Sequence, residues 1–408
     1  MNTRNLSFLL TLCATAFAAG DWPQWRGPNR DGVLPATAEP KSWPAQLNRK
    51  WKIQTGIGHS SPILANGAIY VFSRHQNNET LAKIDPKQGT ALWTQSYPAP
   101  YRMNSAAQSH GEGPKSTPLF HQGRVYTFGI SGILSSWDAG SGALKWRKEF
   151  SSEFKQTSPI FGTAMSPVID RGLLIAHIGG NDDGALTAFE LETGNVRWQW
   201  KGDGPAYASP IIVEAAGVRL VVTQSQGNII GVSAQDGKLL WKIPFTTPYV
   251  QNIVTPLVYK DTLIFSGLSN DTMAVRIVKK GEAWSPDVVW RNKHVSMYMN
   301  SPVLSGGLLF GFSHKNKGQY FCLDPRTGET RWQGDPRQGE NAAMLIGTGS
   351  LLMLNNDGEL IVAKPSGSAF EQIRKYKVAD SATWAHPLPV PSGFVIKDVS
   401  TLAFWSWE

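Results

Sequence analysis

Hydrophobic and polar positions along the chain alternate in short runs, a pattern that predicts β-strands rather than helices. One unit, at residues 300–332, contains four apolar runs separated by turns rich in Gly, Pro and Asp. Such turns are typical of hairpins, because Pro presets φ and Gly accepts φ > 0. Four antiparallel strands in about forty residues is the size of one blade of a β-propeller.

The same unit recurs, each time with an opening Ser/Thr-Pro pair and a closing Trp about 30 residues later, which is a period typical of repeat folds. The opening prolines are Pro62, Pro118, Pro167, Pro210, Pro256 and Pro302, and the closing tryptophans are Trp93, Trp146, Trp198, Trp241, Trp290 and Trp332. A weaker seventh copy covers residues 341–376. An eighth starts at His386-Pro387 and lacks a last strand.

The missing strand is predicted at the other end of the chain. Residues 49–53, around Trp51, have the pattern of a closing strand, and no opening strands precede them. An N-terminal strand that completes the last blade leaves no unpaired sheet edge, which would favour aggregation. The sequence therefore predicts an all-β, eight-bladed propeller of four-stranded antiparallel blades. Residues 21–408 should form one domain, because a ring closes only with all its blades.

Residues 1–20 predict a signal peptide, with a basic residue, an apolar run and a small-x-small cleavage pattern at Ala16-Phe17-Ala18. The apolar run is too short for a membrane span. Cys13 does not predict a lipid anchor, because Leu12 is not the small residue that precedes a lipidated cysteine. We therefore expect secretion to the periplasm, as a monomer without a transmembrane span.

Charge and cysteine content further limit the possible partners and covalent cross-links of the protein. The 39 basic and 31 acidic side chains give a net charge of +8, which is dispersed rather than gathered into a nucleic-acid-binding arm. Removal of the signal peptide would leave Cys322 as the only cysteine, so no internal disulfide is expected. We expect no nucleic acid partner.

Two segments lie outside the repeats. Residues 21–44 contain Trp22 and Trp25, and we expect them to pack across one face of the propeller through these rings, with ligand binding as the alternative. Residues 96–114 are an insertion between the first two blades that carries Arg102 and His110. Long loops on a rigid scaffold are where binding residues tend to lie, and a simple surface flap is the alternative.

Five turns share a further pattern, in which a Gly at the fifth position is followed four residues later by the closing Trp. They are residues 85–93, 138–146, 190–198, 233–241 and 324–332. The pattern resembles the tryptophan-docking motif of the pyrroloquinoline quinone (PQQ)-like propellers, which include quinoprotein alcohol dehydrogenases and the outer-membrane assembly factor BamB. The opening at residues 22–32 is similar to the secreted PQQ-binding-like repeat branch. The resemblance implies structural docking by Trp51, Trp93, Trp146, Trp198, Trp241, Trp290 and Trp332.

The sequence shows no recognisable set of catalytic residues. Enzymes of the family hold PQQ with a vicinal disulfide, a calcium ion and a catalytic Asp, but this chain has no Cys-Cys pair and no recognisable calcium set. Its histidines are scattered, and Asp182-Asp183 lies in a predicted hairpin turn. We predict no catalytic residue, metal ligand or cofactor. The alternative is an enzyme that uses PQQ with calcium, or another chemistry, in the central funnel.

Residues around each Ser/Thr-Pro pair begin the innermost strands and should line that funnel, together with the insertion. Besides His59, Ser60, Ser116, Met165 and Asn252, we name as ligand-binding residues Arg102, His110, Lys115, Tyr207, Gln251, Tyr298, Asn300, Trp384 and His386. Lys115 and Arg102 would make its mouth mildly positive and favour an anionic or polar ligand, such as a glycan or an acidic peptide. A water-filled channel is the alternative. The resulting hypothesis is a binding or scaffolding protein of the cell envelope, BamB-like, with an envelope protein as a further partner.

Overall fold

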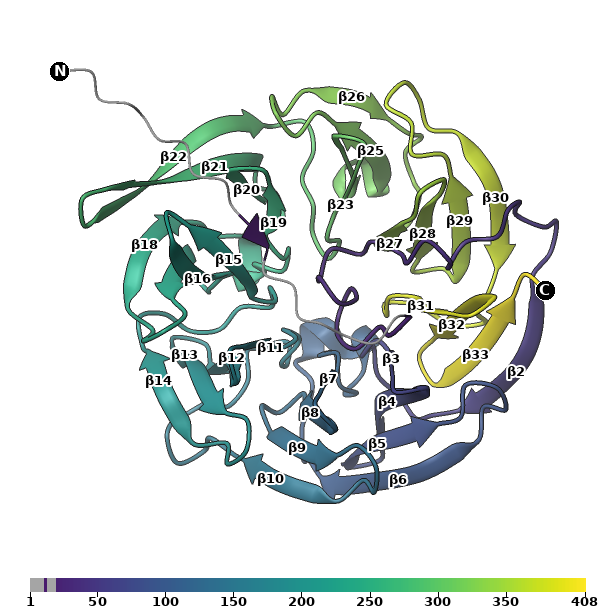
Figure 1. Cartoon of the computed structure of the whole chain (residues 1–408), viewed down its shortest axis with the longest axis horizontal. Helices are drawn as coiled ribbons and strands as arrows, with labels where there is room; N and C mark the ends of the chain where they lie inside the picture. The colour runs from purple at the N-terminus through teal and green to yellow at the C-terminus, as the bar shows by residue number, and fades with distance from the viewer. Residues whose placement is uncertain (1–10, 13–19) are drawn as a thin grey trace.

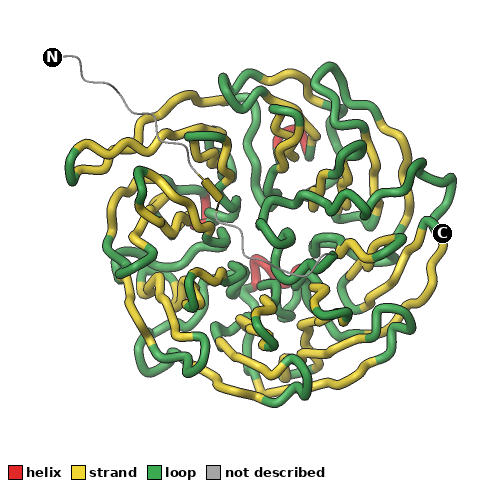
Figure 2. The backbone as a smooth tube through the Cα atoms, viewed as in Figure 1, coloured by secondary structure: helices red, strands yellow, loops and turns green. Residues whose placement is uncertain are grey.

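The computed structural model describes residues 11–12 and 20–408, so most of the predicted signal peptide lies outside the described residues. The chain forms an eight-bladed β-propeller, which confirms the predicted fold (Figure 1). Almost all of its regular secondary structure is strand, and loops join the strands and the blades (Figure 2). Among the described residues, no helix has the length and apolar content to cross a membrane.

Each blade is an antiparallel sheet whose strands follow one another from the axis to the rim. The first four blades are β3 (Ile63–Ala65), β4 (Ala68–His75), β5 (Asn78–Ile84) and β6 (Ala91–Pro98); β7 (Leu119–His121), β8 (Arg124–Phe128), β9 (Leu134–Asp138) and β10 (Leu144–Lys148); β11 (Val168–Asp170), β12 (Leu173–Gly180), β13 (Asp183–Glu190) and β14 (Val196–Trp200); and β15 (Ile211–Ala215), β16 (Val218–Gln224), β17 (Asn228–Ser233) and β18 (Leu239–Pro244). The short strand β1 (Thr11–Leu12) adds to the fourth of these sheets beside β15.

The remaining blades follow the same order. They are β19 (Leu257–Tyr259), β20 (Thr262–Phe265), β21 (Thr272–Lys280) and β22 (Ala283–Asn292); β23 (Val303–Ser305), β24 (Leu308–Ser313), β25 (Gln319–Leu323) and β26 (Thr330–Gln333); β27 (Ala342–Ile346), β28 (Leu351–Asn355), β29 (Glu359–Ala363) and β30 (Gln372–Lys377); and β31 (Leu388–Val390), β32 (Gly393–Lys397), β33 (Thr401–Ser406) and β2 (Asn48–Gln54). Three 3₁₀ helices lie in loops: η1 (Ser105–His110), η2 (Pro248–Val250) and η3 (Lys315–Lys317).

The N-terminal strand closes the ring, as predicted. β2 pairs antiparallel with β33, so that Trp51 lies opposite Phe404 and Ile53 opposite Leu402. Figure 1 shows the two ends of the described fold meeting in this blade, the purple β2 outside the yellow β33. The last blade therefore has its four strands, and the outer edge of β33 is paired.

The hydrophobic core lies between neighbouring blades. Tyr70 of the first blade, for example, packs with Phe120 and Trp137 of the second. At the rim, five closing tryptophans lie against the glycine turn of the next blade, in the pairs Trp51–Gly89, Trp93–Gly142, Trp146–Gly194, Trp198–Gly237 and Trp290–Gly328. A Cβ at any of these glycines would come within 3 Å of the indole, so only Gly allows the contact.

The indole N–H groups of these rings also join blades. Trp51, Trp146, Trp198 and Trp290 donate to the carbonyl of the second residue of the facing turn, at 2.9–3.1 Å. Trp332 donates to Ser366 in the seventh blade at 2.8 Å. These five joints therefore combine a packed indole ring with one hydrogen bond.

Two tryptophans depart from this arrangement. The Nε1 of Trp93 has no acceptor within the described residues, because Tyr70 and Lys83 already donate to the carbonyl of Ala139. Trp241 lies against Gly231 of its own blade instead of a turn of the next one. In that next blade the long β21–β22 hairpin, which projects from the ring in Figure 1, replaces the docking turn.

A second set of inter-blade bonds lies near the axis. In four of the six repeats the backbone N–H of the Ser or Thr before the Pro donates to the hydroxyl of its counterpart in the next blade: Thr117 to Ser166, Ser166 to Ser209, Ser209 to Thr255, and Thr255 to Ser301, at 2.9–3.4 Å. The Ser or Thr of the repeat is thus explained, because its hydroxyl accepts the backbone N–H of the neighbouring blade.

Candidate functional site: an axial cavity

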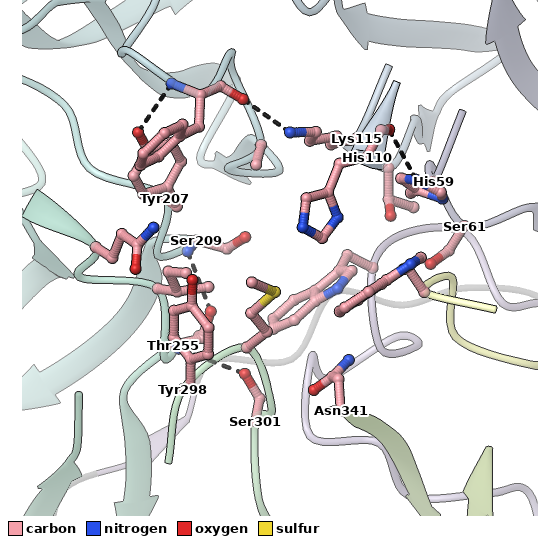
Figure 3. Close-up of a pocket in the computed structure, with 18 of the residues that line it drawn as sticks. His59, Ser61, His110, Lys115, Tyr207, Ser209, Thr255, Tyr298, Ser301 and Asn341 are labelled. Carbon is pink, nitrogen blue, oxygen red and sulfur yellow. Dashed lines mark hydrogen bonds between the residues drawn. The ribbon is translucent and has the colours of Figure 1, made fainter. Parts of the chain in front are cut away.

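A cavity of about 230 Å³ lies at the centre of the ring. Side chains from the inner ends of the blades form its wall, and the N-terminal segment (Trp25) and the insertion (Ala106, Ala107, His110) contribute to it. Figure 3 shows the His110 ring pointing into this space, between Lys115 on one side and Asn341 on the other. All the predicted ligand-binding residues except Arg102 and Asn300 line the cavity.

A simple alternation decides which residues reach the cavity. In six blades the residue two positions before the Ser/Thr-Pro site lines it: His59, Lys115, Ala164, Tyr207, Ile253 and Met299. The residue between them is buried inside the blade, because successive side chains of an extended chain point to opposite sides. Trp384, two positions before His386, follows the same rule in the eighth blade.

This alternation explains where the sequence prediction failed. Ser60, Ser116, Met165, Asn252 and Asn300 were placed in the funnel, but all five are buried and none lines the cavity. Counting in steps of two from each Ser/Thr-Pro would have excluded all five, but it would also have excluded Tyr298, which lines the cavity three positions before Ser301.

Two residues named as ligand-binding do other things. The side chain of Asn300 donates to Ala342 of the seventh blade and accepts the N–H of Phe312 at 3.0 Å, which is a structural role. Arg102 is exposed and does not line the cavity. Among the described residues, Lys115 is therefore the one Lys or Arg side chain in the cavity wall.

The insertion brings His110 into the site through the short helix η1. Asn104 caps η1 by accepting the N–H of Ala106 at 2.9 Å, and Glu112 accepts the N–H of Met103 at 3.1 Å. The carbonyl of His110 lies 2.9 Å from Nε2 of His59, which ties the end of η1 to the first blade. The insertion is therefore a wall of the cavity and not a free flap.

Three aromatic rings form one cluster in this wall. The His110 ring meets Trp384 edge-on at 4.8 Å between centroids, and His59 lies 6.1 Å from the same indole. Burial lowers the pKa of His59 to about 3, with Lys115, Lys397 and His110 adding repulsion, and burial also lowers the pKa of His110. Both imidazoles are neutral at pH 7.

Lys115 supplies the charge. Its Nζ donates to the carbonyl of Phe161 at 2.8 Å, and burial lowers its pKa to about 8. Tyr207 meets the same segment, because its hydroxyl accepts the N–H of Phe161 at 3.2 Å (Figure 3). Phe161, in the loop between β10 and β11, therefore positions both groups, and no repeat signal marked it in the sequence.

The N-terminal segment closes another part of the wall. Trp22 is buried and pairs with Leu64, while Trp25 lines the cavity and meets His386 edge-on at 5.7 Å. Arg26 and Arg30 are buried behind the Trp25 indole, at 5.4 and 5.5 Å from its centroid.

The two arginines fix the segment to different parts of the ring. Arg26 donates to the carbonyl of Pro302 in the sixth blade, and Arg30 donates to Ser166 and Pro167 in the third, at 3.0 and 2.9 Å. Burial lowers the pKa of Arg26 to about 10 and that of Arg30 to about 9, so both remain cationic at pH 7. From here the chain runs outward along the seventh blade, where Trp43 donates to Ser350 at 2.7 Å.

The wall does not fit a calcium-bound quinone. Calcium takes six to eight oxygen ligands, carboxylates prominent among them. No Asp or Glu is among the residues lining the cavity, nor do the described residues contain a cluster of three or more His, Cys, Asp or Glu that could hold a metal. The same lining offers no carboxylate as a general acid or base. The cavity is equipped to bind, with aromatic faces, hydroxyls, amides and one ammonium group.

This fold and this site define a PQQ-like eight-bladed propeller with a ligand-sized axial cavity. A family model described as "Outer membrane protein assembly factor BamB" matches residues 77–334. The chain belongs to this family.

Individual relatives agree with that assignment. BamB of Shewanella oneidensis is 25% identical over 243 residues, which cover 56% of this chain and 59% of that protein. Quinohemoprotein alcohol dehydrogenase ADH-IIG of Pseudomonas putida is 22% identical over 225 residues, covering 48% of this chain and 30% of that one. The crystal structure of BamB from Moraxella catarrhalis superimposes with a TM-score of 0.60 at 13% identity, covering 88% and 99% of the two chains. At that identity the likeness shows the fold alone.

Proposed function

We propose that this protein is a binding and scaffolding propeller of the cell envelope, secreted to the periplasm, whose polar or anionic ligand occupies the axial cavity. The observation that carries the proposal is the wall itself, which brings aromatic, hydroxyl, amide and ammonium groups together without a carboxylate. Such a wall orients a ligand through a few polar contacts and offers no carboxylate as a general acid or base.

The relatives named as outer membrane protein assembly factors support an envelope protein as a further partner. A BamB-like part in outer-membrane protein assembly is the finer form of the proposal. In that case the ring supplies a rigid frame, and the cavity holds a glycan or a short acidic segment of the partner.

Site-specific photo-crosslinking tests the proposal in cells. A photoreactive phenylalanine derivative replaces Tyr298 in the cavity wall or, as the matched control, Leu92 on the outer strand of the first blade, which is 56% exposed. We expect an envelope component to be captured from position 298 and not from position 92. Capture from the outer position alone would place the partner on the blade edges and refute binding in the cavity.

A quinone-dependent oxidoreductase is the second candidate. The similarity to ADH-IIG favours it, whereas the carboxylate-free lining does not suit the calcium ion of such enzymes. The two candidates differ in a measurable way, because only the second predicts electron transfer to a dye.

A further inference from the structure

Four hydroxyl groups of the cavity wall are free to donate a hydrogen bond to a ligand. Ser61, Ser209, Thr255 and Ser301 all line the cavity, and each of these oxygens accepts a backbone N–H from a neighbouring blade. Within the described residues none of the four donates a hydrogen bond in return. A hydroxyl has one donor and two acceptor sites, so each retains an O–H for a ligand. Figure 3 shows Ser209, Thr255 and Ser301 following one another along one side of the site.

The one Lys or Arg side chain that lines the cavity is positive, and no Asp or Glu lines it. Lys115 lines it and is bonded to a neutral carbonyl, with two of its three N–H groups left over. Lys397 is buried close enough to His59 to lower the pKa of that imidazole, and Arg26 does the same to His386. Since no lining residue carries a carboxylate, the field in the cavity favours an anion.

The aromatic walls disfavour a cation for a second reason. A cation-binding site needs electron-rich ring faces. Behind Trp25, however, the guanidinium groups of Arg26 and Arg30 already interact with the indole. Trp25 is therefore a poor partner for a further cation, whereas Trp25, Trp384 and Tyr207 all offer flat rings on which the C–H face of a sugar can stack.

The size of the cavity limits the ligand. Its volume of about 230 Å³ is below the roughly 300–1,000 Å³ typical of sites for drug-sized ligands. A single hydroxylated ring with an acidic group is of this scale, whereas a folded partner is not.

We infer that the axial cavity binds a uronic acid residue, with its carboxylate at Lys115 and the Ser/Thr hydroxyls and its ring against the aromatic walls. This rests on the proposed function and specifies the ligand of the same site. A uronic acid unit of an acidic polysaccharide and a free sugar acid share this chemistry. An acidic peptide presents a carboxylate without a sugar ring.

Isothermal titration calorimetry of the purified protein tests the inference with matched probes. D-Glucuronate, D-glucose and D-glucosamine share one ring and differ in charge, and N-acetyl-aspartyl-glutamate supplies carboxylates without the ring. We expect glucuronate to bind at least about tenfold more tightly than glucose, the factor that corresponds to ~1.4 kcal/mol. Glucosamine should bind most weakly of all. A glucuronate dimer that binds more tightly than the monomer would indicate a polysaccharide source, and equal affinity a free sugar acid.

Two variants locate the binding. Lys115→Met should reduce glucuronate affinity to the level of glucose, while Arg102→Met, which removes a cation of the preceding insertion that lies outside the cavity, should leave it unchanged. Unchanged thermal unfolding of both variants shows that the ring is intact. Thr255→Val, which removes one O–H, should weaken glucuronate by a smaller factor.

Several results would overturn the inference: equal affinity for the three sugars, no heat of binding with glucuronate, unaltered binding by Lys115→Met, or preference for the peptide. None of these touches the envelope role, because crosslinking from position 298 would still report a cavity ligand of another kind. Loss of that crosslink together with intact glucuronate binding would instead refute the scaffolding role alone.

Discussion

The backbone N–H of His386 donates to the hydroxyl of Ser61 at 2.9 Å, across 325 positions of the chain. This bond joins the eighth blade to the first at the axis. At the rim the same blades are joined by Trp51, whose Nε1 donates to the carbonyl of Pro86 at 3.0 Å. Ring closure is therefore held at both its inner and outer ends, without a disulfide.

Deletion of residues up to Ile53 should open the ring. It removes nearly all of β2 with Trp51, exposes the edge of β33, and leaves the glycine turn at Gly89 without its indole. We expect aggregation or loss of cooperative unfolding, because an unpaired β-edge recruits other chains. Size-exclusion chromatography and thermal melting check this. A monomeric variant with an unchanged melting curve would contradict the closure argument.

Substitutions at two glycines of the third blade distinguish the cost of backbone strain from the cost of losing the contact with the indole. Gly194 has φ +67° and its added Cβ would lie 2.8 Å from Trp146, whereas Gly172 has φ +82° and open space around it. Gly172→Ala should cost about 1–2 kcal/mol, the price of a left-handed L-residue. Gly194→Ala should cost roughly 1–3 kcal/mol more, since overpacking adds to that strain.

Denaturant unfolding of both variants measures the difference. If Gly172→Ala and Gly194→Ala lose the same unfolding free energy, the indole of Trp146 can move away from the added methyl group at no cost. The close contact at the turn would then not stabilise the joint. Trp146→Phe offers a further check, because the smaller ring should recover part of the loss in the Gly194→Ala background.

Stability should fall between pH 7 and pH 4. Burial lowers the pKa of His59, His177 and His386 to about 3, 4 and 3, against 6.5 in the unfolded chain. The unfolded state then binds more protons, so the stabilisation present above pH 6.5 is lost as the pH falls towards the folded-state values. Each histidine contributes up to ~1.4 kcal/mol per pH unit in this window.

Urea unfolding at pH 7 and pH 5 measures that slope. His177→Gln is the informative variant, because His177 lies outside the cavity lining, with Nε2 at 3.0 Å from the carbonyl of Asp203. It should make the slope shallower by the contribution of one histidine, at most ~1.4 kcal/mol per pH unit. Equal stability at the two pH values would show that the buried imidazoles accept protons without unfolding.

Redox turnover should be absent. Purified protein mixed with PQQ and calcium should not reduce an electron-accepting dye with alcohols or sugars, because the lining offers calcium no carboxylate. A quinoprotein dehydrogenase assayed in parallel is the positive control. Dye reduction clearly above a boiled sample would establish the oxidoreductase reading.

The repeat made the ring predictable, whereas the cavity wall was predictable only in part. Ser/Thr-Pro and Trp mark bonds between blades, so their spacing reports the fold directly. Lys115 and Tyr207 could be placed because they precede those marks. Asn300 could not be separated from Met299 without the strand's alternation, which the repeat comparison did not consider.

Other parts of the site depend on contacts that leave no local signal. Trp25 reaches the cavity because buried arginines carry its segment to the third and sixth blades. His110 arrives through η1, whose position depends on a bond to His59. Trp241 packs in a cluster with Leu263 and Met273 of the next blade, but not on a glycine turn, because that blade has exchanged its turn for the β21–β22 hairpin.

The alternation along the inner strands also bears on how such proteins diverge. At Lys115 and Tyr207 the side chain faces the cavity, while its neighbours Ser116 and Ala208 face the protein interior. Mutations at the facing positions can change what is bound while the blade joints stay as they are. Single substitutions at the facing positions can thus change the ligand during evolution with little effect on the stability of the fold.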